Sequence, residues 1–591
     1  MTNTPKHIRR FDLPNSASSP TTWDTVHPVL ARVYQHRGVS NADELDYRLE
    51  KLPSPHTLKG LPQALALLTD ALERSSRILV VGDFDADGAT ATALALRALR
   101  ALGAAHVDFL VPNRFEYGYG LTPEIVALAL TRQPDLLITV DNGISSIEGV
   151  AAARAAGINV LVTDHHAGDQ LPEANAIVNP NQPDCPFLDK SLAGVGVLFY
   201  LLLALRSHLR THGYFAARNL KEPNLAQWLD LVALGTVADV VPLSRINRIL
   251  VQQGLLRIRA GHCCAGIKAL AEVAGRQLPR LHAGDFGFAI GPRLNAAGRL
   301  DDMSLGIETL LTDDHDIAKH YAHELDSMNR ERRAIEADMQ AEAFNDPRLQ
   351  QWAAQDTDTL PWSLCLYDSA WHQGVIGILA SRIKEQFHRP AIVFANADAD
   401  TIKGSARSVP GLHIRDALNS IAARHPHILS KFGGHAMAAG LTLKHEHFAE
   451  FCALFEAEVR FCLDETDLEA TLVSDGELAA KDLSLELAET LRAAGPWGQR
   501  FAEPLFDGVF NVKSQQLVGE RHLKLRLSPC ADSSIELDAI AFGVDVALWP
   551  NLAVQQVHIA YRLDVNEFRG LRTAQLLVLY IENQYSPADN A

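Results

Sequence analysis

Apolar residues recur along this chain in two patterns that alternate from about residue 60 onward. Short, nearly continuous apolar runs are typical of strands buried in a parallel sheet, and longer stretches with apolar positions three or four residues apart are typical of helices. Strands are expected at residues 78–81, 106–111, 136–140 and 160–163, and helices at residues 61–75, 89–102, 123–130 and 146–156. This alternation predicts a doubly wound parallel sheet, which binds ligands at the carboxyl ends of its strands.

The pattern changes further along the chain. Residues 313–346 carry apolar side chains at helical spacing, which predicts a long helix connecting two domains. Residues 347–462 return to mixed strands and helices, and residues 463–591 contain about five alternating stretches. These stretches favour a small barrel of the OB type, although alternation alone leaves an immunoglobulin-like sandwich open. The expected fold class is therefore a multidomain α/β protein with a C-terminal β-barrel.

Length and composition support several domains. The chain has 591 residues, too many for a single hydrophobic core. Five parts are expected, namely an N-terminal cap (1–55), a parallel-sheet domain (56–312), a connecting helix (313–346), a second α/β domain (347–462) and the barrel (463–591). We see no signal peptide and no apolar run of about 18–20 residues, so we expect no membrane partner. Seven cysteines without Cys-x-x-Cys spacing indicate a reducing, cytoplasmic location.

Charge is distributed unevenly along the chain. The formal net charge of −17 argues against non-specific coating of nucleic acid. Residues 201–300, however, contain 13 Lys and Arg against 5 Asp and Glu. One region is therefore suited to a polyanion.

Three carboxylates follow the first predicted strand. Asp83, Asp85 and Asp87 occupy alternate positions directly after residues 78–81. Carboxylates at the end of a buried strand require a cation, and oxygen ligands suit a divalent metal ion. An EF-hand loop would need a glutamate where Leu94 stands, and a preceding helix rather than a strand. The nucleophile motif of haloacid-dehalogenase phosphatases and a solvated acidic turn remain open for this stretch alone.

Other strand ends carry further polar groups. Asp141 follows the third strand, Asp164, His165 and His166 follow the fourth, and a later apolar helix leads to Asp239. Because the carboxyl ends of parallel strands meet at one edge, these groups would converge with Asp85 and Asp87. Histidine together with carboxylates suits manganese or magnesium, and bridging carboxylates suit two ions. Taken singly, Asp141 could cap a helix and Asp164 could be a turn residue.

The combination of these motifs resembles a known family. Asp164-His165-His166, after Asp83-Phe-Asp-Ala-Asp87 and Asp141-Asn-Gly, resembles the DHH phosphoesterase superfamily over roughly residues 75–460. The resemblance implies that residues 56–312 form a DHH catalytic domain and residues 347–462 a DHH-associated, substrate-binding domain. It implies two Mn²⁺ or Mg²⁺ ions held by Asp85, Asp87, Asp141, His165 and Asp239. Asp83 and His166 would act beside the metals, and Asp164 would orient the histidines.

One position departs from the pattern of the family's pyrophosphatases. They carry a histidine where this chain has Val81, which favours the nuclease branch.

The resemblance also implies residues that contact the substrate. In the segment 291–299, Arg293 and Arg299 would balance phosphate charge and Asn295 would approach the backbone closely, with Arg114 on the opposite wall. In the second α/β domain, segments 403–408 and 433–440 combine flexible backbone amides with cations or hydroxyls, as phosphate oxygens require. Ser405 and Arg407 would hold a terminal 5′ phosphate, with His372, Gly434 and His435 at the scissile or a neighbouring phosphate. The glycine-rich turn at residues 193–197 is open to either helix packing or phosphate binding.

The function implied is a metal-dependent 5′-to-3′ exonuclease of single-stranded DNA, acting in DNA repair and recombination. Two ions about 3.5–4 Å apart would activate a water and stabilise the leaving oxygen, and the barrel would bind the strand. The implied partners are single-stranded DNA, a single-stranded-DNA-binding protein and a helicase, with a monomeric enzyme.

Two alternatives stay open. A phosphodiesterase acting on short RNA or cyclic dinucleotides would not need the added barrel. A non-catalytic replication scaffold would have lost ligand positions that are all filled here.

Overall fold

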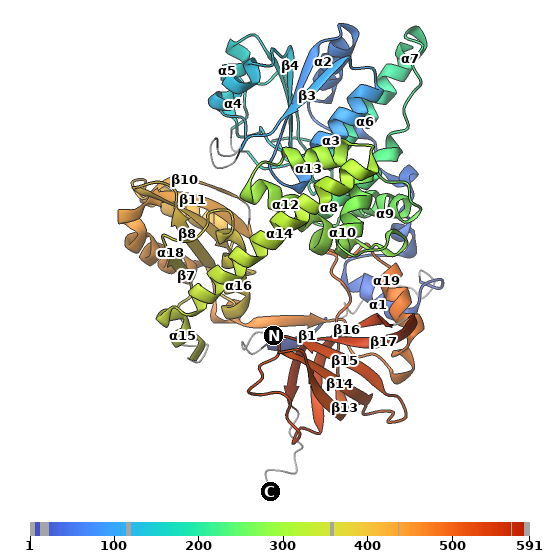
Figure 1. Ribbon diagram of the computed structural model, residues 1–591, viewed down its shortest axis with the longest axis vertical. Helices are drawn as coiled ribbons and strands as arrows, with labels where there is room; N and C mark the ends of the chain where they lie inside the picture. The colour runs from blue at the N-terminus through green and yellow to red at the C-terminus, as the bar shows by residue number, and fades with distance from the viewer. Residues whose placement is uncertain are drawn as a thin grey trace.

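The computed structural model describes residues 6–11, 23–113, 117, 120–168, 170–354, 360–434, 436–568 and 570–583. Figure 1 shows three lobes: a first α/β domain, a second α/β domain connected to it by the helix α14, and a β-barrel. This arrangement confirms the predicted fold class. Among the described residues, none of the helices combines the length and the apolar character that a membrane crossing requires.

The first domain is built on a five-stranded parallel sheet. Its strands, in the spatial order β3-β2-β4-β5-β6, are β3 (His106–Leu110), β2 (Arg77–Gly82), β4 (Leu136–Val140), β5 (Asn159–Thr163) and β6 (Ala176–Val178). The last residues of the inner strands are in register, because Gly82 pairs with Val140 and Val140 pairs with Thr163. The residues that directly follow these strands therefore lie at the same edge of the sheet.

Helices cover both faces of this sheet. They are α2 (Leu61–Glu73), α3 (Ala86–Ala101), α4 (Pro123–Leu130), α5 (Ile147–Ala155) and α6 (Gly194–Thr211). Alternate residues of β2 enter two different cores: Ile78 and Val80 pack with α2, α3 and α6, whereas Leu79 and Val81 pack with α4 and α5. A near-continuous apolar strand is what two covered faces require.

The rest of the first domain is helical. It contains α7 (Tyr214–Ala217), α8 (Leu229–Ala238), α9 (Arg245–Arg259), α10 (Ala265–Val273), α11 (Ala283–Asp285), the π-helix η7 (Phe286–Ile290), α12 (Gly291–Leu300) and α13 (Ser304–Leu311). In the described parts of the chain, short 3₁₀ helices are η2 (Ala42–Leu45), η3 (Leu49–Lys51), η4 (Pro55–Thr57), η5 (Leu225–Trp228), η6 (Leu278–Arg280), η9 (His445–His447), η10 (Glu465–Leu468) and η11 (Ala480–Asp482). In this helical part, α8 and α12 contact α3 and bring their residues to the sheet edge.

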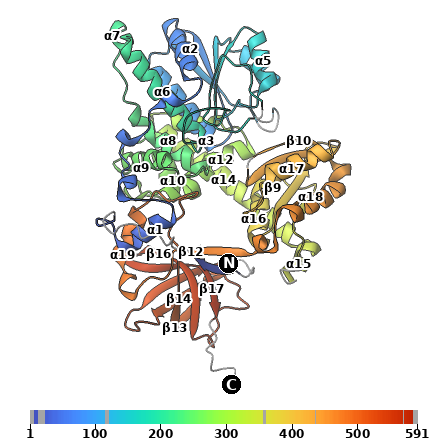
Figure 2. The same cartoon turned by 180° about the vertical axis from the view of Figure 1, so that it is seen from behind.

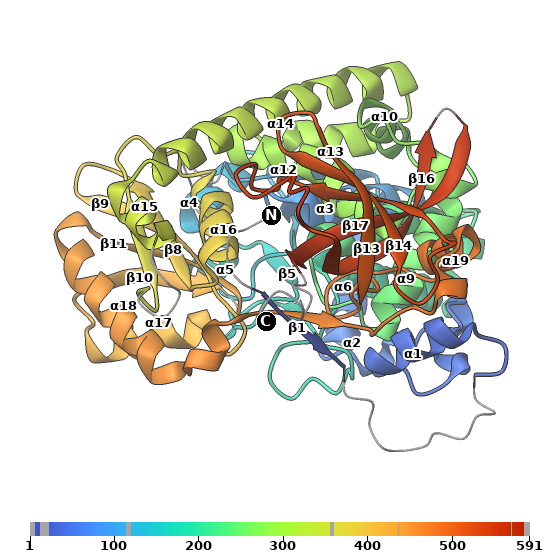
Figure 3. The ribbon, with the colours of Figure 1, turned by 90° about the horizontal axis from the view of Figure 1, so that it is seen from below.

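The long helix α14 (His315–Phe344) joins the two α/β domains (Figure 3). Asp314 caps its N-terminus by accepting hydrogen bonds from the backbone N–H groups of Asp316 and Ile317. Its N-terminal half packs into the first core through Leu325, and its C-terminal half packs into the second domain through Met339. This confirms the predicted connecting helix.

The second domain has a mixed sheet in the order β10-β11-β9-β8-β7. Its elements are α15 (Pro347–Ala354), β7 (Leu364–Tyr367), α16 (Ile376–Phe387), β8 (Ala391–Asn396), β9 (Thr401–Arg407), α17 (Ile414–Arg424), β10 (Leu429–Gly434), β11 (Ala438–Lys444) and α18 (Phe448–Cys462). Only the β7–β8 pair is parallel among the described strands of this sheet. The strand β9 lies between β11 and β8, so its backbone is hydrogen-bonded on both sides.

The third lobe is a closed five-stranded barrel in the order β13-β14-β15-β17-β16. Its strands are β13 (Phe506–Val518), β14 (His522–Pro529), β15 (Leu537–Phe542), β16 (Gln556–Phe568) and β17 (Leu571–Asn583), and α19 (Leu485–Ala493) packs against β16. A closed barrel excludes the immunoglobulin-like sandwich that alternation alone left open.

The N-terminal segment crosses to the barrel. The strand β1 (Lys6–Arg10) pairs in parallel with β12 (Ala470–Ser474), which runs from the second domain to the barrel (Figure 2). The helix α1 (Pro28–His36) follows, and Tyr34 stacks on Trp497 with ring centroids 5.8 Å apart. The segment predicted as an N-terminal cap therefore contacts the C-terminal part of the chain; its predicted boundary, like the others, stays a prediction.

Candidate metal centre

Seven side chains meet at the carboxyl edge of the first sheet. Three groups have potential ligand atoms all within 4.8 Å of one another: Asp83 with Asp85 and Asp141; Asp87 with His165 and Asp239; and Asp141 with His165 and His166. Because the groups share Asp141 and His165, they form one cluster. The five predicted metal ligands and the two residues predicted beside them thus lie together.

The loop between β2 and α3 orients two of the carboxylates. Asp85 caps α3, because its Oδ1 accepts hydrogen bonds from the backbone N–H groups of Asp87 (2.9 Å) and Gly88 (3.0 Å). Asp87 lies in the first turn of α3 and is completely buried. The helix start therefore positions both side chains, and its positive dipole end favours their negative charge.

The glycine-rich turn at residues 193–197 begins α6 and contacts this cluster. The backbone N–H groups of Gly194 and Val195 donate to the two carboxylate oxygens of Asp87, at 2.6 and 3.0 Å. A Cβ on Gly194 would lie 2.5 Å from Oδ1 of Asp141, so a larger residue would displace that carboxylate. Of the two readings left open by the sequence, the structure shows helix packing against the carboxylates of the cluster.

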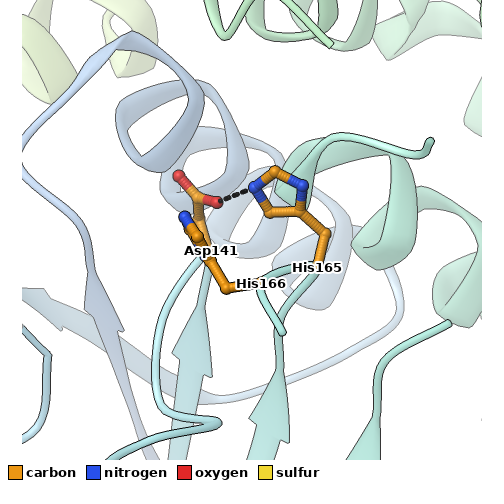
Figure 4. A group of neighbouring side chains, drawn as sticks. All are labelled: Asp141, His165 and His166. Carbon is orange, nitrogen blue, oxygen red and sulfur yellow. Dashed lines mark ion pairs between the residues drawn. The ribbon is translucent and has the colours of Figure 1, made fainter. Parts of the chain in front are cut away.

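His165 lies between two carboxylates. Its Nε2 is 3.2 Å from Oδ1 of Asp141 (Figure 4) and 3.5 Å from Oδ2 of Asp239. Within the described part of the chain, the buried His165 Nε2 and Asp239 Oδ2 have no hydrogen-bond partner. Such atoms are costly to bury unless a cation binds them. Asp141 also has a left-handed backbone, with φ of 63°, a conformation that aspartate and asparagine adopt more readily than most non-glycine residues.

Asp164 holds the second histidine. Its Oδ1 lies 2.8 Å from Nδ1 of His166, and its Oδ2 accepts a hydrogen bond from the backbone N–H of Ile144 at 2.9 Å. Burial lowers the pKa of His166, but the hydrogen bond to Asp164 and the negative charges of Asp164, Asp239 and Asp83 together outweigh it and raise this pKa to about 9. Burial conversely raises the pKa of Asp164, but the hydrogen bond to His166, the charges of both histidines and the hydrogen bond from Ile144 together bring it down to about 2. The pair is therefore an imidazolium and a carboxylate at neutral pH.

The remaining carboxylates repel one another. Burial raises the pKa of Asp87 to about 7, with the charge of Asp239 adding to the effect. Burial and the charge of Asp85 raise the pKa of Asp239 to about 8, and burial and the charge of Asp87 raise that of Asp141. Buried like charges at this spacing are stable only when neutralised. Oxygen ligands with one imidazole fit Mn²⁺ or Mg²⁺.

The helix α12 forms one wall beside the cluster. Oδ1 of Asn295 accepts a hydrogen bond from the backbone N–H of Ala86, at 2.8 Å, and so ties α12 to the carboxylate loop. Arg299 Nη1 donates to the carbonyl of Gly374 in the second domain, at 3.3 Å. Arg299 therefore lies at the junction of the two α/β domains, and Asn295 lies beside the loop that carries the carboxylates.

Arg293 lies differently from what was expected. Its Nε and Nη2 are 2.9 and 2.8 Å from Oδ1 of Asp326 on α14, and its Nη1 donates to the carbonyl of Ala289 at 2.6 Å. The guanidinium thus connects α12 to the long helix. A phosphate contact from Arg293 stays a prediction that would require it to leave this ion pair.

Ser405 and Arg407 lie together in the second domain. Arg407 donates from Nη1 to Oγ of Ser405 and from Nε to Oγ of Ser381, both at 3.1 Å. In the described residues, no carboxylate lies within 4 Å of this guanidinium, and burial lowers the pKa of Arg407. A Cβ on Gly377, in the first turn of α16, would lie 2.8 Å from Arg407 Nη2, so a helix N-terminus adjoins the pair.

The structure corrects one part of the expectation for this segment. Residues 403–407 were taken to offer flexible backbone amides, but they belong to β9, where Ser405 pairs with Val393 on one side and Gly440 on the other. Backbone groups in a ladder are already satisfied. The strand β9 can therefore offer side chains, but not backbone amides, to a ligand.

The remaining predicted residues lie nearby or outside the described residues. His372 precedes α16, and its Nδ1 accepts a hydrogen bond from the backbone N–H of Gly374 at 3.1 Å. Gly434 ends β10 with φ of 144°, where a Cβ would lie 2.4 Å from the carbonyl oxygen of Ala438. Arg114 and His435 lie outside the described residues.

Comparison with known proteins identifies the family. The model of the DHH family, N-terminal domain, matches residues 77–236, the DHHA1 domain matches 362–460, and the RecJ OB domain matches 474–580. The single-stranded-DNA-specific exonuclease RecJ of Dickeya dadantii is 55% identical over 94% of this chain and 96% of its own length. This chain belongs to the RecJ family.

Solved RecJ structures share the arrangement of the whole chain. RecJ from Thermus thermophilus in complex with Mn²⁺ superposes with a TM-score of 0.79 at 32% identity, covering 98% of this chain and 80% of that one. The same RecJ in complex with Mg²⁺ gives a TM-score of 0.75 at 31% identity, covering 98% and 79%.

Two asparagines of this RecJ-family site were missed from the sequence. Asn179 Nδ2 donates to the carbonyl of His166 at 2.8 Å, and Asn181 Nδ2 donates to the carbonyl of His165 at 2.5 Å. Both follow β6, a strand of three residues. The only available signal was a short apolar run before Asn179, too weak to predict a strand.

Proposed function

We propose that this RecJ-family chain is a Mn²⁺- or Mg²⁺-dependent exonuclease that removes nucleotides from the 5′ end of single-stranded DNA. The observation that carries the proposal is the seven-residue cluster of acids and histidines at the sheet edge. The names of its relatives supply the substrate: these are single-stranded-DNA-specific exonucleases. The two RecJ structures with Mn²⁺ and Mg²⁺ support the choice of cation.

The metal ions would be held by Asp85, Asp87, Asp141, His165 and Asp239. Nε2 of His165 and Oδ2 of Asp239 fit this assignment, because both are buried, make no hydrogen bond within the described residues and lie among the other acids. When bound, the ions supply Lewis acidity and neutralise charge at the phosphate. Asp83, within reach of Asp85 and Asp141, completes the acidic side of the cluster.

His166 would provide a positive charge and a proton. Its Nδ1 is engaged by Asp164, so the second ring nitrogen, Nε2, carries the proton toward the cluster. A pKa of about 9 keeps the ring protonated at neutral pH. A protonated imidazole stabilises negative charge that develops on a phosphate and can donate to a leaving oxygen.

The 5′ polarity is assigned to Ser405 and Arg407. Arg407 is largely buried without a carboxylate partner among the described residues and adjoins the N-terminus of α16, so an anion is the missing partner. The loop before α16 contacts Arg299 through Gly374, which brings this pair close to the metal-side wall. A strand anchored there by its 5′ phosphate would be cut near its end. His372, Gly434, His435 and Arg114 are proposed to contact neighbouring phosphates.

Strand selectivity is assigned to the junction of the two α/β domains and to the OB-type barrel. The other partners rest on family resemblance: a single-stranded-DNA-binding protein, a helicase and a role in repair and recombination, for a monomeric enzyme. We place it in the cytoplasm, because none of its seven cysteines, all of them described residues, forms a disulfide.

The test is digestion of end-labelled single-stranded and duplex DNA with added Mn²⁺. Wild type should release 5′-terminal nucleotides from single strands only, and Asp141→Asn should abolish release. Asparagine tolerates the left-handed backbone of residue 141, so this variant keeps the turn. Asp184→Asn is the matched control, since Asp184 is exposed and also has a left-handed backbone, with φ of 56°.

Other outcomes would contradict the proposal. Cleavage confined to very short RNA or cyclic dinucleotides would indicate a small-substrate phosphodiesterase. Strand binding without cleavage by the wild type would indicate a non-catalytic scaffold.

A further inference from the structure

The buried face of α14 becomes polar between the two α/β domains. Its buried residues are three or four positions apart along the helix: Ala318, Ala322, Leu325, Asn329, Arg332, Glu336, Met339 and Ala343. Leu325 lies in the core of the first domain and Met339 in that of the second, so the three polar residues lie between the two cores. Asn329, Arg332 and Glu336 are 1%, 9% and 8% exposed. Charged residues that are buried in this way need a reason other than packing.

Glu336 connects α14 to α16, which lies against it in the second domain (Figure 3). Its Oε1 is 3.0 Å from Nε of Arg382 on α16, and its Oε2 is 3.2 Å from Nη1 of Arg332 on α14 itself. Arg332 also donates from Nη2 to Oδ1 of Asn329, at 3.1 Å. Each oxygen of the carboxylate therefore binds a different arginine, one on each helix.

The residue next to Arg382 binds the arginine to which the 5′ phosphate is assigned. Oγ of Ser381 accepts a hydrogen bond from Nε of Arg407 at 3.1 Å. Successive residues of an α-helix point about 100° apart, so α16 directs Ser381 toward Arg407 and Arg382 toward α14. Gly377, one turn earlier, leaves room for Arg407, because a Cβ there would lie 2.8 Å from its Nη2. The position of α16 therefore determines where the guanidinium of Arg407 lies.

The helix α14 is also bonded to the metal-side wall. Asp326 on α14 pairs with Arg293 of α12 at 2.8 Å, and α12 carries Asn295, which is hydrogen-bonded to the carboxylate loop. One helix thus has an ion pair toward the metal centre and, further along, the pair of Glu336 toward α16. Buried ion pairs are weak sources of net stability, and their best-attested use is to fix one arrangement of the elements that they join. The network is therefore suited to positioning.

We propose that Glu336 is a positioning residue for the 5′ phosphate. It holds α16, and through α16 the guanidinium of Arg407, at a fixed distance from the metal centre. This inference rests on the proposed function, in which Arg407 anchors the 5′ end of the strand. It adds that the long helix, and not the second domain alone, sets the place of that anchor. Without the pair to Arg382, α16 shifts on α14 and the phosphate binds more weakly, whereas the metal ligands stay in place.

The test is a double-mutant cycle between Glu336 and Arg407, on single strands that carry either a 5′ phosphate or a 5′ hydroxyl. For phosphorylated strands only, Glu336→Gln should raise KM, and the Kd measured by fluorescence anisotropy, roughly 3- to 10-fold. The double variant should bind these strands no more weakly than Arg407→Gln alone, because both changes act on the same contact. Arg382→Gln should reproduce the effect of Glu336→Gln, and Arg382→Lys should recover most of the loss.

Two further variants separate positioning from stability. Glu458→Gln is the matched control, because Glu458 is also buried, on α18, and pairs with Arg424 of α17 in the same domain. It should leave the ratio of the two Kd values unchanged. The triple variant Arg332→Met, Glu336→Leu and Arg382→Met replaces the charges by apolar side chains, a change that is often neutral for stability. It should keep the wild-type Tm and Mn²⁺ affinity, yet lose the same part of the preference for a 5′ phosphate.

Equal KM and Kd values for Glu336→Gln and wild type on phosphorylated strands would overturn the inference. Losses that multiply in the double variant would also overturn it, since Glu336 would then act independently of Arg407. An equal loss on both kinds of strand would do the same, since the change would then affect the domain as a whole. Absence of cleavage by the wild type would overturn the proposed function alone, because the anisotropy comparison still tests Glu336.

Discussion

The backbone N–H of Gly194 donates a 2.6 Å hydrogen bond to Oδ2 of Asp87, across 107 residues of sequence. The first turn of α6 thereby fixes a carboxylate that belongs to the first turn of α3. Helix termini that meet in this way keep acids in place that would otherwise repel one another.

Replacing Gly194 should damage the metal centre without unfolding the domain. In Gly194→Ala the new Cβ would meet Oδ1 of Asp141 at 2.5 Å and push that carboxylate aside. We expect Mn²⁺ affinity to fall about 10- to 100-fold, as for other changes to groups that orient ligands, with a similar loss of kcat. Gly196→Ala is the control, because its Cβ would meet nothing closer than Leu192 at 3.4 Å. Wild-type Mn²⁺ affinity in Gly194→Ala would contradict this prediction.

Metal binding should stabilise the fold by an amount that grows with the logarithm of the metal concentration above its Kd. Mn²⁺ at about 1,000 times its Kd should add about 4 kcal/mol to the free energy of unfolding. Asp141→Asn should lose this gain, yet in chelator it should unfold at or above the wild-type temperature, because one of several repelling acids has been removed. Calorimetry with Mn²⁺ and with EDTA measures both. A large loss of stability for Asp141→Asn in EDTA would mean that the carboxylate is held by protein contacts rather than by a cation.

Arg407 should set the preference for a 5′ phosphate. Arg407→Gln should raise KM for 5′-phosphorylated strands at least about tenfold, the typical effect of losing a charge-assisted contact, and should leave 5′-hydroxyl strands nearly unchanged. Arg460→Gln, an exposed arginine on α18 paired with Glu456, controls for charge. An equal rise in KM for 5′-phosphorylated and 5′-hydroxyl strands would contradict the assignment of the 5′ polarity to Arg407.

A histidine in the barrel should make stability depend on pH. His558 lies 3.1 Å from Asp507 and 2.7 Å from Glu582, and the hydrogen bond to Asp507 outweighs burial and raises the pKa of His558 above 6.5. The pKa of His558 is higher in the folded protein than in the unfolded chain. Its contribution to the free energy of unfolding is therefore fully present below about pH 6.5 and is lost as the pH rises through the folded pKa. His558→Gln should remove about 1 kcal/mol at pH 6 and less at higher pH. Urea unfolding at both pH values measures this, with the exposed His427→Gln as control; a pH-independent difference would argue against protonation.

The sheet and its acids could be predicted because their signals are local. The strands β2, β4 and β5 each contain a single apolar run, and Asp141 or His165 needs only to follow such a run to reach the common edge. The strand β9 was missed because its buried positions, Gly404 and Ala406 among them, are small. Small residues hide the apolar-polar alternation that identifies a strand.

Partners distant in sequence could not be predicted. Arg293 looked available for phosphate because its partner Asp326 lies on a separately predicted helix. The amides that bind Asp87 come from a turn 107 residues away, and nothing in that turn specifies its neighbour. Such pairings depend on how the elements pack against one another. The periodicity of a single segment does not predict that packing.

The pairing of β1 with β12 has a consequence for the order of folding. Lys6 pairs with Ala470, and Arg10 reaches Asp507, a partner 497 residues later in the chain. On the ribosome, the first strand must therefore wait until the second α/β domain has been made and the barrel has begun to emerge. Residues 6–10 are thus made long before their partners, and a chain interrupted before residue 470 leaves them without these contacts.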